Sequence, residues 1–236
     1  MILKHLLIGG FLAATITGVL AADSSAKEEV TKAAKALADK PNYAWKTTTV
    51  VPEGTQFRPG PTEGKADKEG TVYLTMTRRD NLVEAVVKNG KATYTNQDGD
   101  WQVAEEGAEG PGRFMAAILR NFKAPAVQAQ EIAGTVKELK KDGEVYSGDL
   151  TEDGAKALMS FGGRRGGGEA PEIKGAKGNA KFWVKDGVLS KYEYSVKGQM
   201  NFNGNDIDVD RVTTTEIKDV GTTKVVVPEA AKKKLS

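Results

Sequence analysis

The 236-residue sequence has no cysteine, and its one histidine, His5, stands near the N-terminus. The absence of cysteine excludes disulfides, thiolate zinc sites and cysteine nucleophiles. Beyond residue 5 the chain also lacks histidine, the usual general base and a common transition-metal ligand. The 34 Lys and Arg against 32 Asp and Glu leave a net charge of +2, without the basic excess of a dedicated nucleic-acid binder. The composition therefore favours a protein that is not an enzyme, with no cofactor and no nucleic-acid partner.

Residues 1–21 have the pattern of a secretory signal peptide. A short polar start precedes the uncharged apolar run Leu6–Leu20, and Val19 and Ala21 supply small side chains before a cleavage site. An uncleaved membrane anchor is the alternative, but the run is short for a bilayer span and contains three glycines. We expect cleavage to leave residues 22–236 as one soluble domain. Export without disulfides fits a bacterial periplasm, or secretion.

The spacing of apolar residues predicts an α+β fold. Helical spacing predicts helices over 25–39, 113–122, a short stretch after Pro125 and a segment from Thr151. Alternation and β-branched residues predict strands at 43–51, 70–77, 82–88, 91–95, about 135–150, 179–185, 188–197, 207–217 and 223–227. The connections have hairpin length, and Asn89-Gly90 has the sequence of a type I′ turn. The sequence therefore predicts an antiparallel sheet with helices on one face.

A glycine-rich segment, 162–178, is predicted to be a mobile loop. Its arginine pair, Arg164-Arg165, raises the alternative of a nucleic-acid or phosphate site. The segment lacks the GK[ST] ending of a P-loop, and two arginines make a small patch. We therefore favour the loop, while noting that the pair has the chemistry to meet a lipid phosphate.

Three charged segments are candidates for a functional site. Asp206, Asp208 and Asp210 resemble a calcium site, but they alternate with apolar residues, which indicates a strand with one solvated face. The acidic stretch 96–100 is predicted to be a hairpin turn. The lysines at 232–234 are predicted to lie in a solvated C-terminal tail. None of these segments predicts a metal site.

Three stretches, 86–101, 182–193 and 213–228, combine hairpin turns with Trp or Tyr strands and a closing Val-Pro. Together with the N-terminal helix, they resemble the LolA-like superfamily, which includes periplasmic lipoprotein carriers and LppX/LprG-like lipid-binding proteins. The resemblance implies a half-open, strongly curved antiparallel β-sheet, an incomplete barrel, with helices on the concave face. It also implies that acyl chains are held between sheet and helices. One departure is that the LppX/LprG branch is lipidated, whereas this chain has no cysteine to lipidate.

The candidate ligand-binding residues form an apolar lid and an aromatic wall. The lid is a stripe on the helix 113–122, which lies between Pro111 and Pro125, and an ordinary core helix is the alternative. Aromatic residues on the predicted strands supply the wall. The residues are Phe114, Met115, Ile118, Leu119 and Phe122 for the lid, and Trp45 and Trp183 for the wall.

The sequence predicts a monomeric carrier or binding protein for an acylated lipid or lipoprotein, with a membrane-anchored protein as donor or acceptor. No Asp or Glu spacing singles out a catalytic pair. The rival is a non-lipid periplasmic sensor or protein-interaction module of the same fold. A filled concave face favours the sensor, and an apolar cavity favours the carrier.

Overall fold

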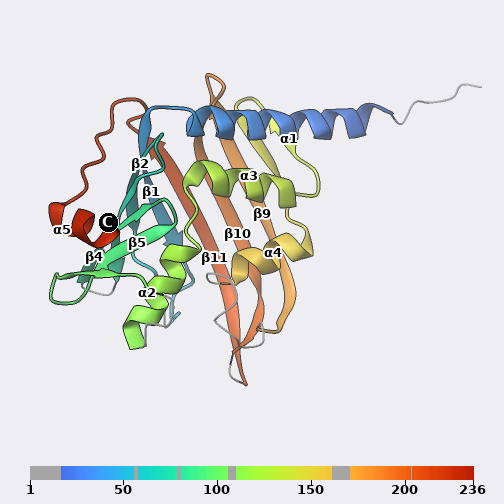
Figure 1. Cartoon of the computed structure of the whole chain (residues 1–236). Helices are drawn as coiled ribbons and strands as arrows, with labels where there is room; N and C mark the ends of the chain where they lie inside the picture. The colour runs from blue at the N-terminus through green and yellow to red at the C-terminus, as the bar shows by residue number, and fades with distance from the viewer. Residues whose placement is uncertain (1–16, 56–57, 79–80, 106–109, 161–170, 203) are drawn as a thin grey trace, which may run out of the picture.

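The computed structural model describes residues 17–55, 58–78, 81–105, 110–160, 171–202 and 204–236. Within these ranges the chain forms one antiparallel sheet and five helices (Figure 1). The strands are β1 (Asn42–Val50), β2 (Thr62–Asp67), β3 (Val72–Arg78), β4 (Asn81–Lys88), β5 (Lys91–Thr95), β6 (Trp101–Val103), β7 (Lys140–Asp142), β8 (Val145–Asp149), β9 (Ile173–Lys185), β10 (Val188–Phe202) and β11 (Asn205–Lys218). The helices are α1 (Thr17–Ala38), α2 (Gly110–Arg120), α3 (Pro125–Thr135), α4 (Glu152–Met159) and α5 (Glu229–Leu235).

The sheet is open. Its strand order is β6-β5-β4-β3-β2-β1-β11-β10-β9-β8-β7, so that β6 and β7 are the two edges. Strands β1 to β6 form one meander and β7 to β11 form another. The two meanders join where β1 pairs with β11, with Trp45 opposite Ile217 and Thr47 opposite Thr215. The predicted α+β class and open antiparallel sheet are therefore confirmed.

Helices α1 to α4 cover one face of the sheet, which we call the inner face (Figure 1). Helix α1 packs on α3 and β10, α4 packs on β9 and β10, and α2 packs on β5. The inward strand positions alternate with outward ones, as the strand period requires. Phe182, Tyr192 and Leu37 are among the fully buried side chains between the layers. The hydrophobic core therefore lies between the inner face and these helices.

Helix α1 begins at Thr17 and not near residue 25 as predicted. The predicted cleavage point after Ala21 therefore lies within helical chain. The apolar face of the predicted helix is confirmed, since Val30, Ala34 and Leu37 are fully buried.

The predicted glycine-rich loop is wrong at its C-terminal end, because β9 begins at Ile173. Residues 162–170 of that prediction lie outside the described residues. Gly175 takes a φ of 62° next to a register shift between β9 and β10. At Gly178 an added Cβ would meet the backbone oxygen of Ser195 closer than 3.0 Å. Here the glycines permit a bulge and a close strand approach, and they do not mark the absence of a strand.

The C-terminal segment also differs from the prediction. Residues 223–227 form no strand. The lysines at 232–234 are exposed, as predicted, but they lie on a helix, α5, whose Ala231 is fully buried. Lys91 Nζ donates to Leu235 O at 3.1 Å, which places α5 on the outer face of the sheet. One helix therefore lies on the face opposite to the other four.

Candidate ligand-binding site on the inner face

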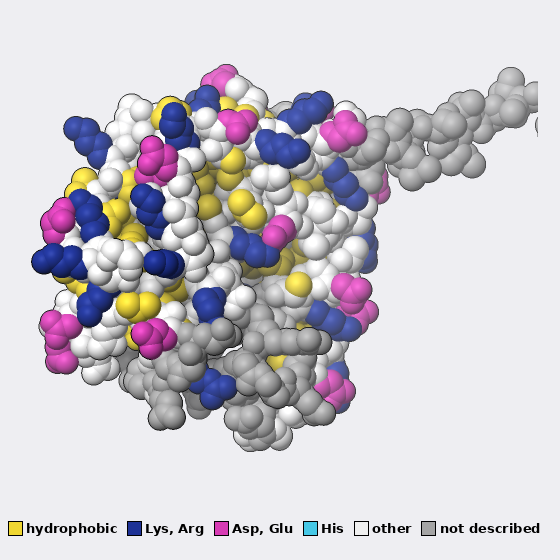
Figure 2. All heavy atoms as spheres, viewed as in Figure 1, with side chains coloured by type: hydrophobic (Ala, Val, Ile, Leu, Met, Phe, Trp, Pro, Cys, Tyr) yellow, Lys and Arg dark blue, Asp and Glu magenta, His cyan; other side chains and the backbone are white. Residues whose placement is uncertain are grey.

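The apolar stripe of α2 divides into two layers. Met115 and Leu119 are 4% and 1% exposed, and therefore belong to the core. The helix predicted at 113–122 runs from Gly110 to Arg120, so that Pro111 lies within it and Phe122 lies two residues beyond its end. Phe114 and Ile118 on α2, and Phe122 after it, are half-buried and pack against the same core. Figure 2 shows hydrophobic side chains gathered in the middle of the helix-covered face, with Lys and Arg around them. One side of α2, with Met115 and Leu119, is therefore an ordinary core face. The other side, which is half-buried, is the one that the predicted lid requires.

Arg78, at the end of β3, joins α2 to the sheet. Its Nη1 lies 3.3 Å from the sulfur of Met115, and its guanidinium carbon lies 4.4 Å from the centroid of the Phe114 ring. A cation over an aromatic face contributes about 0.5–1 kcal/mol at an exposed site. These contacts hold α2 through a ring and a sulfur atom.

Trp45 meets the end of the stripe. Its ring is stacked on Phe122, with centroids 6.2 Å apart and an interplanar angle of 19°. The ring of Tyr43 also contacts Trp45, with centroids 5.7 Å apart and an interplanar angle of 44°. Gly64, opposite Trp45 on β2, leaves room for the indole, since a Cβ there would come within 3.0 Å of three ring atoms. The structure therefore brings Trp45 together with the predicted lid residues.

Trp183 does not belong to this group. Its neighbour Phe182 is fully buried on the inner face, so Trp183 points to the outer face. There Lys191 Nζ lies 4.5 Å from the centroid of its ring. The prediction that Trp183 lines an inner wall is therefore wrong, because strand alternation puts consecutive residues on opposite faces.

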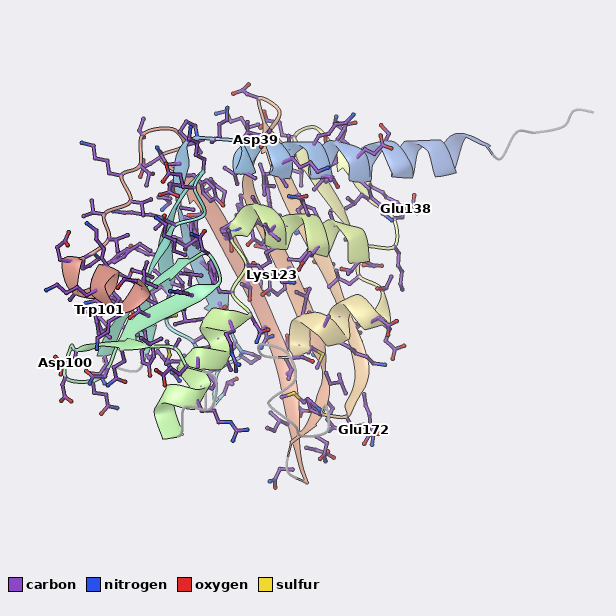
Figure 3. All side chains as sticks on the ribbon, viewed as in Figure 1. Asp39, Asp100, Trp101, Lys123, Glu138 and Glu172 are labelled. Carbon is purple, nitrogen blue, oxygen red and sulfur yellow. The ribbon has the colours of Figure 1, made fainter. Side chains whose placement is uncertain are left out.

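Helix α3 is held to the sheet by hydrogen bonds. The hydroxyl of Tyr192 donates to Gln128 Oε1 at 2.5 Å, and Tyr43 hydrogen-bonds with the backbone of Ala126. Burial raises the pKa of Tyr43 to about 12 and also raises that of Tyr192. Lys123, which bonds to Glu131 at 2.6 Å, lies where α2 leads into α3 (Figure 3). Helix α3 is thus fixed to the sheet through a side-chain amide and a backbone group.

Helix α1 is fastened at an exposed position. Lys141 Nζ lies 2.5 Å from Glu29 Oε2, and the Tyr146 hydroxyl donates to the same oxygen. The bond from Lys141 is the main cause that lowers the pKa of Glu29. This cluster ties the first helix to the β7–β8 hairpin.

The middle of the inner face is polar, which the sequence reading did not predict. Thr47 and Thr49 on β1 face Thr215 and Thr213 on β11, and the paired hydroxyl oxygens are 2.8 and 3.2 Å apart. Arg211, two residues before Thr213, is 8% exposed. Burial lowers the pKa of its guanidinium. The sequence signal for this polar group was the alternating threonines in the segments that form β1 and β11. Their proximity could not be predicted, because only the pairing of β1 with β11 brings the two segments together.

The acidic run on β11 lies on the other side of that strand. Asp206 accepts a bond from Asn201 at 2.7 Å, and Asp210 lies 3.0 Å from Lys197 Nζ. The predicted strand with one solvated face is confirmed. No group of three or more potential metal ligands is found in the part of the chain that the structure describes. Nor does any described helix have the length and apolar character to cross a membrane.

The architecture of the described residues is an open antiparallel sheet with four helices on its inner face. No family model and no curated protein matches the sequence. Among solved structures, the chain is similar to the Mycobacterium tuberculosis lipoprotein LppX, with a TM-score of 0.50 and 11% identity over 87% of this chain and 100% of LppX. This likeness confirms the predicted resemblance at the level of the fold.

Two further solved structures are similar to a smaller degree. LprF from Mycobacterium bovis has a TM-score of 0.45 at 13% identity, over 88% of this chain and 98% of LprF. The LolA superfamily protein NE2245 from Nitrosomonas europaea has a TM-score of 0.35 at 10% identity, over 86% and 94%.

Proposed function

We propose that the protein is an exported carrier or binding protein for an acylated ligand, a lipid or a lipoprotein. It holds the acyl part between α2 and the inner face, acts without catalysis, and exchanges its ligand with a membrane-anchored partner. The LolA-like fold supports the class, and the leader pattern of residues 1–21 supports export.

The observation that carries the proposal is the half-buried layer of α2. Phe114, Ile118 and Phe122 present apolar surface that the core does not fully cover. Part of the contact between α2 and the sheet is made by the ring of Phe114 and the sulfur of Met115 against Arg78. Van der Waals and ring contacts re-form easily on a new apolar surface. The half-buried side of α2 is therefore the part of the inner face that adjusts to a ligand.

The binding energy comes from burial. A chain of about fourteen methylenes, at about 0.8 kcal/mol each, gains on the order of 11 kcal/mol as an upper limit. Release to a partner requires this gain to fall, which an outward movement of α2 achieves by exposing the chain. Function then depends on how tightly α2 is held.

The rival function, a sensor or interaction module, is favoured by the other half of the inner face. There the residues of α1, α3 and α4 pack directly on the sheet, with Ala33, Ala129 and Ala155 at most 1% exposed. A fully filled inner face leaves no space for acyl chains. The two functions therefore predict different behaviour of α2: a carrier requires this helix to move and admit an acyl chain, whereas a sensor does not.

Ile118→Asp separates them, with Val127→Asp on α3 as its matched control, because Val127 is 45% exposed. A carboxylate at 118 enters an apolar space, which costs several kcal/mol unless the helix moves outward. If α2 is a ligand-binding lid, the variant folds, but binding of a fluorescent fatty-acyl probe falls at least tenfold. The control keeps both stability and binding.

Three other results contradict the proposal. Loss of about 3 kcal/mol of unfolding free energy in Ile118→Asp, in a wild type that binds no probe, identifies α2 as a plain core helix. Unchanged probe binding in a stable variant removes α2 from the site. Native mass spectrometry of the purified protein that finds no co-purifying lipid, together with no probe binding, favours the sensor.

A further inference from the structure

Helix α5 lies apart from the other helices, on the outer face of the sheet (Figure 1). It packs on β5 and β6 through a narrow side, where Ala231 is fully buried and Leu235 is half-buried. Residues four apart lie on the same side of a helix. The lysines between them, at 232–234, are turned away from the sheet, and all three are exposed. Most of the circumference of α5 therefore faces solvent.

Three more lysines surround α5. Lys88 and Lys91 pair across the β4–β5 turn, and they point to the outer face because Ala92, the next residue, belongs to the core. Lys91 reaches the end of α5, where its Nζ donates to the carbonyl oxygen of Leu235. Lys224 is exposed on the segment that leads from β11 into α5. Figure 2 shows Lys and Arg side chains gathered at the left, where α5 lies.

These segments hold most of the positive charge of the protein. Residues 88–91 and 222–236 contain six lysines and one glutamate, a net charge of +5, whereas the whole chain carries +2. The rest of the chain is therefore negative, at −3. The glutamate, Glu229, lies 2.5 Å from Lys232, and the aspartates of the next turn, Asp98 and Asp100, follow the other end of β5. The charge is thus separated, with an excess of cations at α5.

Apolar side chains lie among the lysines. A hollow of about 260 Å³ is lined by Lys88, Val227, Lys232, Leu235 and Ser236. Val226, which precedes one of these residues in the chain, is 73% exposed, so an aliphatic side chain is left in water near several cations. We call the six lysines, the hollow and Val226 the α5 surface. It offers ammonium groups to a phosphate and apolar area to the acyl region of a lipid.

We propose that the α5 surface docks the protein on an anionic phospholipid bilayer. All six cations are lysines, and lysine is depleted at protein–protein interfaces, where arginine is enriched. Clusters of about four to eight cations are typical of segments that bind anionic lipids. A lipid phosphate enters the hollow between Lys88 and Lys232, and Val226 enters the boundary between head groups and acyl chains.

Docking through α5 also places α2. Helices α2 and α5 pack on opposite faces of the same strand, β5. A protein that lies on a bilayer through α5 therefore brings the strand that carries α2 to the membrane, where an acylated ligand is exchanged. The docking itself goes beyond the proposed function, because it needs no ligand on the inner face.

Cosedimentation with vesicles tests docking in the absence of any other ligand. One set of vesicles is pure phosphatidylcholine, and the other contains equal parts of phosphatidylcholine and phosphatidylglycerol. The wild-type protein is expected to bind the anionic vesicles at least a hundredfold more tightly. This preference is expected to fall strongly in about 1 M salt, where charges are screened beyond about 3 Å.

Two triple variants locate the binding surface. The α5 variant carries Lys232→Gln, Lys233→Gln and Lys234→Gln, and glutamine keeps the helix because its helix propensity is close to that of lysine. A lysine near an anionic bilayer strengthens binding by about fivefold, so we expect this variant to bind at least tenfold more weakly. The control removes the same charge from exposed positions of β7 and β9, with Lys140→Gln, Lys177→Gln and Lys185→Gln. It is expected to change binding less than threefold.

Two single variants test the apolar part of the surface and its independence from α2. Val226→Ser is expected to weaken binding several-fold, because the exposed valine no longer enters the bilayer. Ile118→Asp, which is designed to abolish acyl binding at α2, is expected to bind anionic vesicles as the wild type does. A loss of vesicle binding in Ile118→Asp would show that vesicle lipid enters the site at α2, and would overturn docking by α5.

The remaining outcomes are equally distinct. Equal binding to both kinds of vesicle, or to neither, overturns the proposal and leaves the carrier function standing. Equal weakening in the two triple variants also overturns it, since net charge alone then governs binding. Polyglutamate that competes with the vesicles, while Val226→Ser binds normally, identifies an acidic protein as the partner instead. Anionic vesicle binding without any acyl-probe binding supports the α5 surface and contradicts only the proposed carrier function.

Discussion

A methyl group added at Gly64 is expected to disturb the contact between the sheet and α2. Gly64 lies on β2 opposite Trp45, and a Cβ there would come within 3.0 Å of three atoms of the indole ring. The ring has little freedom to move, because it is 3% exposed and contacts the rings of both Tyr43 and Phe122. Gly64→Ala therefore forces either β2 or the indole away from its present position.

The magnitude follows from two opposing effects. Overpacking of a buried site costs about 1–3 kcal/mol. Replacing a strand glycine returns about 0.5–1 kcal/mol, because alanine has less freedom to lose on folding. We expect a net loss of about 1–2 kcal/mol in the free energy of unfolding. For a chain of this size that corresponds to a fall in Tm of about 2–8 °C.

Thermal unfolding and acyl-probe titration together measure the effect. Gly134→Ala, in α3, is the matched control, since a Cβ there meets nothing within 4 Å. It is expected to keep probe binding and to raise stability by about 0.5–1 kcal/mol, as a glycine-to-alanine change in a helix does. Gly64→Ala is expected to weaken probe binding as well, because a displaced Trp45 no longer stacks on Phe122.

A Gly64→Ala protein that melts at or above the wild-type temperature would refute the packing argument. A clear fall in Tm with unchanged probe affinity would keep the packing but would separate Trp45 from the ligand. Either result can be read without knowledge of the natural ligand.

Two further predictions concern how α1 and α3 are fastened. Tyr192→Phe leaves the half-buried Gln128 without the bond of 2.5 Å from the buried Tyr192 and is expected to cost about 1–3 kcal/mol of unfolding free energy, measured by urea denaturation; a loss below about 0.5 kcal/mol would contradict this. The bond from Lys141 lowers the pKa of Glu29, so the stabilisation by Glu29 is present above the ordinary carboxyl pKa of about 4.3 and is lost as the pH falls through the lowered value. The Tm of Glu29→Gln is therefore expected to lie below that of the wild type at neutral pH and to approach it in acid, and a difference that is the same at both pH values would show that Glu29 acts without its charge.

The predictable parts of the fold are those whose signals are local. The Asn89-Gly90 turn takes φ values of 51° and 78°, as a type I′ turn requires, and the strand at 91–95 was predicted with its observed bounds. Strand β2 was missed, because TEGKAD is polar and contains Gly64. It is a strand because β1 and β3 supply hydrogen bonds on both of its sides. Pairing of this kind is not visible in the sequence of the segment itself.

In the candidate site, too, local patterns could be predicted from the sequence, and contacts between distant segments could not. The apolar stripe of α2 has a helical period and was identified, whereas Trp183 was assigned to the wrong face because no partner fixed the phase of its strand. Arg211 and the threonines gave no signal of their own. Their proximity depends on the register that places Thr49 opposite Thr213.

The pairing of β1 with β11 sets the order in which the protein reaches its final structure. Thr47 and Thr215, which bond at the centre of the sheet, are 168 residues apart in the chain. Contacts between such distant segments form slowly, since a long loop must close before they contribute. Until β11 has been synthesised, the first meander presents an unpaired β1 edge and cannot complete the sheet. The sheet is therefore completed only after nearly the whole chain has been synthesised, because its two meanders meet at the pair formed by β1 and β11.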